Sequence, residues 1–109
     1  MTRTELIKLI GDILTKLDVL RGSLLPDEPN RIELDRLRKK LDGLQLKLVK
    51  NDFDDNTQKY LDATEKLKAI NEELKKTIKK LEKIVTTLET VKNLIAVVDE
   101  IISIVLPLV

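Results

Sequence analysis

The sequence predicts an all-α protein, an elongated antiparallel helical bundle resembling a coiled coil, with a long C-terminal helix. Charged residues make up 36% of the chain and hydrophobic residues 42%, and the only aromatic residues are Phe53 and Tyr60. This composition is typical of long helices. Apolar residues also recur every three or four positions through most of the chain, which indicates amphipathic helices. We expect a single helical domain over residues 1–109, with helices at about 4–25, 30–50 and 57–106.

The first helix is predicted from a capping signal and an apolar seam. Thr2 and Glu5 have the spacing of a capping box, in which each residue bonds the backbone of the other. The seam of the helix is flanked by further apolar residues, so we expect the helix to need more than one neighbour. Gly22, Pro26 and Pro29 then disfavour its continuation. The seam consists of Leu6, Ile10, Ile13, Leu17, Leu20 and Leu24.

The second helix has a narrower seam and more basic residues. Asn30 and Glu33 have the spacing of a second capping box. Between Arg31 and Lys50 the chain has seven basic and three acidic residues, a local positive charge that could contact phosphates. The helix has no aromatic residue for base stacking and the basic residues surround it, so we do not expect nucleic acid as the partner. An acidic protein is at least as good a candidate. The seam consists of Leu34, Leu37, Leu41, Leu44 and Leu48.

The third helix is predicted to be continuous because residues 57–106 contain neither Gly nor Pro. Apolar residues recur every seven positions from Tyr60 to Val109, with a second series three positions after each, and Thr77 is the one exception. A sustained heptad pattern of this kind predicts a surface that packs on other helices. We therefore expect the apolar stripe to form an interface with another chain or a partner helix. The interface residues predicted are Leu81, Leu88, Val91, Ile95, Val98, Ile102 and Val105.

Two arrangements of these helices fit the pattern. In the favoured one, the first two helices lie end to end and run antiparallel to the third, because their combined length matches it. The alternative is a compact three-helix bundle whose third helix protrudes or breaks. In both, the flanking apolar residues exceed what one chain can cover, which favours self-association.

The residue inventory gives little support to an enzyme. The chain has no His and no Cys, so it lacks the usual proton shuttle and thiolate chemistry, and no cofactor or metal ligand set is expected. Residues 54–65 resemble a calcium loop, but Lys59 stands where the sharp turn requires Gly. Helix capping accounts for the acidic residues of this segment without a bound metal.

The leading hypothesis is a non-enzymatic helical interaction or scaffold protein acting through self-association or a partner-helix interface. The alternative is a membrane-active protein whose apolar C-terminal helix inserts after rearrangement. Asp99 and Glu100 make that helix a poor transmembrane span. We expect a cytoplasmic protein, because Glu5 and Asp12 interrupt the N-terminal apolar residues as they would not in a signal peptide.

Overall fold

The computed structural model describes residues 1–107 and forms a four-helix bundle measuring 41 × 23 × 18 Å. The helices are α1 (Arg3–Gly22), α2 (Pro29–Lys50), α3 (Gln58–Thr77) and α4 (Ile84–Val105), with a short 3₁₀ turn η1 (Leu81–Lys83) before α4. The prediction of an all-α helical bundle is confirmed. The seam position Val109 lies outside the described residues.

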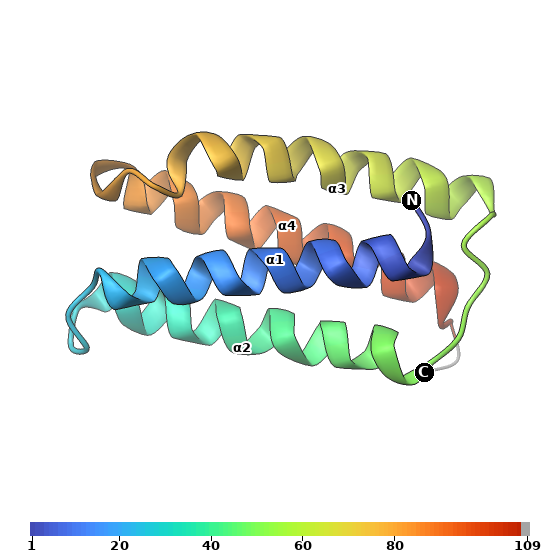
Figure 1. The fold of residues 1–109 in the computed structure, drawn as a ribbon, viewed down its shortest axis with the longest axis horizontal. Helices are drawn as coiled ribbons and strands as arrows, with labels where there is room; N and C mark the ends of the chain where they lie inside the picture. Colours follow the sequence, from blue (N-terminus) through green and yellow to red (C-terminus); the bar gives the residue numbers. More distant parts are fainter. Residues whose placement is uncertain (108–109) are drawn as a thin grey trace.

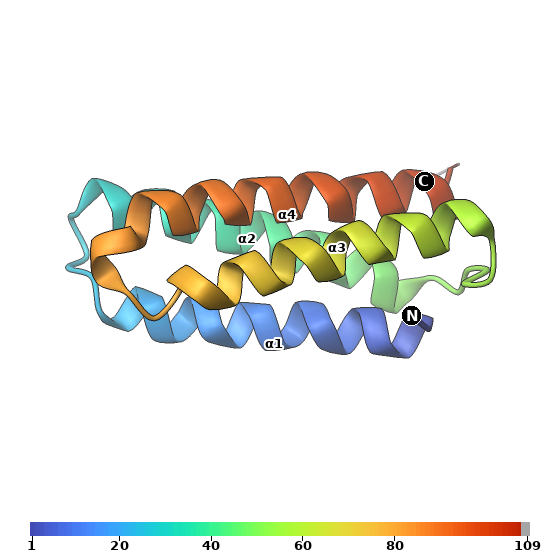
Figure 2. The same cartoon turned by 90° about the horizontal axis from the view of Figure 1, so that it is seen from above.

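The helices pack around a square in the order α1, α2, α4, α3 (Figure 1). α1 and α3 run in one direction, and α2 and α4 run in the other. α1 packs on α2, α2 on α4 and α4 on α3, whereas the backbones of α1 and α3 make few close approaches. Figure 2 shows α3 inclined to α1 on this fourth side. The bundle is therefore less tightly closed between α1 and α3 than elsewhere.

The expected continuous helix over residues 57–106 is wrong, because the chain reverses between Thr77 and Ile84 to give α3 and α4. The first two helices also pack side by side rather than end to end. Both corrections have one cause. Folding α4 back buries its apolar side on α3 and α2, and this burial outweighs the local preference for uninterrupted helix. The result is closer to the alternative with a broken third helix.

The predicted seams form one continuous core. Every seam residue of the first two helices is buried, and Tyr60, Leu67 and Leu74 of α3 are fully buried. Three polar side chains are also buried: Thr64, Asn71 and Thr87. The Thr87 hydroxyl donates to the Thr77 hydroxyl oxygen at 3.0 Å, which satisfies one polar pair between α3 and α4. Hydrophobic periodicity therefore identified burial correctly along most of the chain.

The helix starts agree only in part with the capping predictions. The Glu5 N–H donates to Thr2 Oγ1 at 3.1 Å and the Thr2 N–H donates to Glu5 Oε1 at 2.9 Å, which confirms the first capping box. The backbone hydrogen bond from Thr2 lowers the pKa of Glu5. The second box is wrong: α2 starts at Pro29, whose fixed φ suits the first helical turn, and no side chain caps it. Thr57 caps α3 by accepting from the Tyr60 N–H at 3.3 Å.

Candidate interaction surface

Most residues of the predicted interface are already covered by the chain itself. Leu88, Val91, Ile95, Val98 and Ile102 lie in the core and are at most 7% exposed, and Val105 is half-buried. Leu81, at 48% exposed, is the one member that remains open to a partner. The heptad pattern thus correctly indicated that α4 is buried, and the structure provides α2 and α3 as its neighbours.

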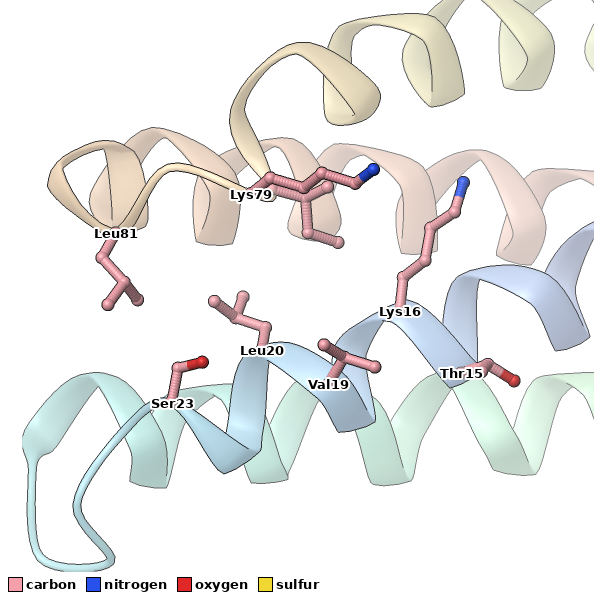
Figure 3. Close-up of a pocket in the computed structure, with 8 residues that line it drawn as sticks. Thr15, Lys16, Val19, Leu20, Ser23, Lys79 and Leu81 are labelled. Carbon is pink, nitrogen blue, oxygen red and sulfur yellow. The ribbon is translucent and has the colours of Figure 1, made fainter.

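Leu81 borders a hollow of about 310 Å³ at the end of the bundle where α3 turns into α4. We call it the turn-end hollow. The end of α1 forms one wall and the turn after α3 forms the other, as Figure 3 shows. The hollow exists because α1 and α3 do not approach closely on this side. Its apolar lining consists of Val19, Leu20, Ile78 and Leu81, of which Val19 is 71% exposed.

Two lysines border the turn-end hollow from opposite walls. Lys16 projects from α1 and Lys79 from the turn after α3, and their ammonium groups lie on the same side of the hollow in Figure 3. No acidic residue is among the lining residues. Within residues 1–107, neither lysine takes part in an ion pair. The hollow therefore combines an apolar floor with uncompensated positive charge.

Exposed apolar side chains gather at the same end of the bundle. Among the described residues, seven large hydrophobic side chains are substantially exposed, and two of these, Leu46 and Val49, lie toward the far end of α2. The other five lie where α1 ends, α2 begins and α3 turns into α4, which is one end of the bundle in Figure 1. They are Val19, Leu25, Ile32, Leu81 and Val85.

The three arginines of α2, Arg31, Arg36 and Arg38, are each paired with a carboxylate of the chain. The Arg38 guanidinium donates to both carboxylate oxygens of Asp18 on α1, at 2.8 and 3.2 Å. Arg36 donates to both oxygens of Glu33, at 3.0 and 2.8 Å, and Lys92 of α4 lies 3.4 Å from the same carboxylate. The hydrogen bonds from Arg36 lower the pKa of Glu33 to about 2. These arginines hold carboxylates in place, so they do not form a free stripe for phosphates.

Two arginines close helix ends, a role that the sequence reasoning missed. The Arg3 guanidinium donates to the backbone oxygens of Leu48, Val49 and Asn51 at 2.9–3.0 Å, where α2 ends. Arg31 donates to the Leu24 oxygen at 2.9 Å, just beyond α1. The final carbonyls of a helix lack intrahelical donors and carry partial negative charge, so a guanidinium is a suitable cap. No local motif marks these pairs, because their partners lie as many as 48 residues away.

The acidic residues form no recognisable metal centre. Asp54 Oδ1 accepts from the Asn56 N–H at 2.9 Å in a turn, and Asp55 Oδ2 accepts from the Arg3 N–H at 2.8 Å at the start of α1. The Gln58 amide donates to Asp62 at 2.7 Å within α3, so the calcium-like segment is used for turn, capping and helix contacts. Across residues 1–107, no three acidic side chains are grouped so that they could hold a metal ion. Within the same residues, no helix has both the length and the apolar character required to cross a membrane.

Comparison of the chain with protein-family models, with curated proteins and with solved structures gave no match. We therefore infer the function of the chain from the geometry of the turn-end hollow and of the helices around it.

Proposed function

We propose that this protein is a non-enzymatic helical interaction protein that binds a partner helix at the turn-end hollow. The observation that carries the proposal is the exposed apolar pair Val19 and Leu81 beside the unpaired Lys16 and Lys79. Isolated apolar side chains are common on protein surfaces, but an apolar hollow with charged residues at its edge is typical of binding sites.

The shape and charge of the hollow favour an acidic amphipathic helix as the partner. An amphipathic helix can place apolar side chains at positions i, i+3 and i+4 into a groove between two helices. Acidic residues beside those anchors would then face Lys16 and Lys79. Charge complementarity of this kind improves specificity and the association rate more than it improves affinity. Such a helix can come from another protein or from a second copy of this chain.

We also propose that the protein acts in the cytoplasm, and the residue inventory supports both this location and a non-enzymatic role. The chain contains no His or Cys, and the residues lining the hollow include no carboxylate that could act as an acid or base. The absence of cysteine suits a reducing compartment such as the cytoplasm.

Selection from a displayed library of helical peptides would test the proposal. We expect peptides that bind the wild-type protein to carry acidic residues flanking an i, i+3 or i, i+4 apolar pair. Binding should be lost in Val19→Asp, because the new carboxylate lies at the apolar floor and repels acidic peptides. Val49→Asp is the matched control, since Val49 is also exposed on a helix but lies away from the hollow.

Three results would count against the proposal. These are failure to enrich any peptide, enrichment without acidic residues, and equal loss of binding in the Val49→Asp control. The membrane-active alternative is tested in parallel by adding wild-type protein to dye-loaded vesicles of neutral or anionic lipid. Dye release that requires α4 to leave the bundle would favour that alternative.

A further inference from the structure

The turn between α3 and α4 contains no residue that forbids a helix. Residues 78–83 read Ile-Lys-Lys-Leu-Glu-Lys, without Gly or Pro, and Leu, Lys and Glu are all good helix formers. No residue of the described chain has a positive φ. Lys80 has an extended rather than helical backbone, with φ −113° and ψ 102°. The reversal is therefore not specified by the residues of the turn themselves.

The apolar pattern also continues through the turn without a change of phase. Leu74, Leu81 and Leu88 are spaced by seven residues, and Ile84 follows Leu81 by three. A helix through residues 78–83 would thus keep one apolar stripe from α3 to α4. Since local sequence favours the continuous helix, we attribute the reversed chain to the burial of α4 on α2 and α3.

A second copy of the chain offers α4 the same burial surface. We propose that two copies exchange α4, so that α3, the turn and α4 become one helix and each α4 packs on α2 and α3 of the other copy. The helix from Gln58 to Val105 would be ~72 Å long at about 1.5 Å per residue. The bundle itself is 41 Å long, so this helix would reach well into a second bundle. Exchange replaces each lost contact with an identical one, which is why it is a low-cost route to dimers.

The exposed apolar side chains lie where the two copies would meet. When residues 78–83 become helical in both copies, the ends of the two bundles that carry this turn meet around the two-fold axis of the dimer. Five of the seven exposed large hydrophobic residues in the described chain are at this end, including Leu81 and Val85 in or beside the turn itself. In one copy they face water. In the exchanged dimer, the same residues of the second copy become their neighbours. This inference does not depend on the partner helix proposed above.

Cross-linking can distinguish exchange from ordinary association. The chain has no cysteine, so Lys66→Cys with Glu100→Cys introduces a single reactive pair. The original side chains form an ion pair between α3 and α4, with Lys66 Nζ 3.2 Å from Glu100 Oε1. A short bismaleimide will join the two cysteines within one chain in the reversed form. It will join two chains in the exchanged form. The protein is refolded from guanidinium at low and at high chain concentration before it is cross-linked.

Leu81→Pro is the variant that should block exchange. Pro suits the first residue of η1, and the extended Lys80 before it has the conformation that a following Pro requires. A continuous helix would lose the Leu81 N–H bond in each chain, and the Pro ring would clash with the preceding turn of the helix. We expect the dimer association constant to fall at least tenfold. Leu81→Ala is the matched control, because it removes the same apolar side chain and still permits the helix.

The proposal predicts a species of twice the 12.5 kDa chain mass after refolding at high concentration, measured by analytical ultracentrifugation. This species should give interchain cross-links, and Leu81→Pro should reduce its amount much more than Leu81→Ala. Monomer at every concentration would overturn the proposal. A dimer with only intrachain cross-links, or a Leu81→Pro protein that dimerises as well as Leu81→Ala, would overturn it too. Loss of peptide binding in Val19→Asp concerns the turn-end hollow and does not affect these outcomes.

Discussion

Replacing Arg3 with Met should destabilise the bundle by more than its place on the first turn of α1 suggests. In the wild type, the Arg3 guanidinium donates to three backbone oxygens at the end of α2, all at 2.9–3.0 Å. It also lies 5.8 Å from the centre of the Phe53 ring. Met keeps the hydrophobic stem and good helix propensity, so the substitution removes mainly the charged group.

The expected loss follows from these contacts. Hydrogen bonds to charged groups stabilise proteins by about 1.5–3 kcal/mol each when buried, but the helix end can recover bonds to water once Arg3 is removed. The favourable interaction with the helix dipole adds about 0.3–1 kcal/mol. The pair with fully exposed Asp52, at 3.8 Å, should contribute almost nothing. We expect a total of about 2–3 kcal/mol, with non-additivity between the three bonds.

Urea denaturation followed by circular dichroism would measure this loss. Arg3→Lys is the control, because Lys keeps a positive charge near the end of α2 but cannot reproduce the fork of donors. The Arg3→Lys variant should lose less free energy of unfolding than Arg3→Met does, but should still be less stable than the wild type. A loss of less than about 0.5 kcal/mol for Arg3→Met, typical of an ordinary surface position, would refute the capping role.

Three further outcomes follow from buried groups. The double variant Ile95→Asp/Ile102→Asp should unfold the bundle, since both sites are at most 7% exposed and an unpaired buried charge costs several kcal/mol. The control Val85→Asp, at a site that is 72% exposed, should leave the thermal midpoint nearly unchanged. Burial raises the pKa of Tyr60 from 10.0 to about 12, so the folded protein holds the phenol proton more tightly than the unfolded chain does. The resulting contribution to the stability of the fold is complete below pH 10 and is lost as the pH rises through 12. Tyr60→Phe should remove this contribution to the loss of stability at alkaline pH. Because the Tyr60 hydroxyl has no hydrogen-bond partner within the described residues, the variant should be no less stable at neutral pH. Asn71→Leu should raise the thermal midpoint, because Asn71 Oδ1 is buried and has no hydrogen-bond partner among residues 1–107, and a lower midpoint would contradict this reasoning.

The sequence was sufficient to predict which residues are buried along most of the chain. The seam from Leu34 to Leu48 is buried as predicted, because a helix has to turn its apolar stripe away from water whatever covers it. The same property explains the incomplete prediction for α4. Periodicity shows that Val91 and Ile95 are buried, but it does not show whether the covering surface belongs to the same chain.

The reversal at residues 78–83 and the turn-end hollow were beyond sequence reasoning. Residues 78–83 contain no Gly, Pro, Asn or Asp that would mark a turn, and the chain reverses there because burial of α4 outweighs the local preference for helix. Val19 and Leu81 line the same hollow although they are 62 residues apart in the sequence, and only the packing of the helices places them there. Arg3 was missed for a related reason: its partners are distant backbone oxygens, which carry no sequence signature.

The helix order around the square has a consequence for how the chain folds. α1 with α2, and α3 with α4, are neighbours in sequence, so each pair closes only a short loop. α2 with α4 is the close pairing that joins the two halves. Low sequence separation favours fast folding, and two hairpins should form before they dock. Residues 51–57 keep the hairpins at a high effective concentration for that last step. Cutting the bond between Asp54 and Asp55 would make docking a bimolecular reaction while leaving every helix intact.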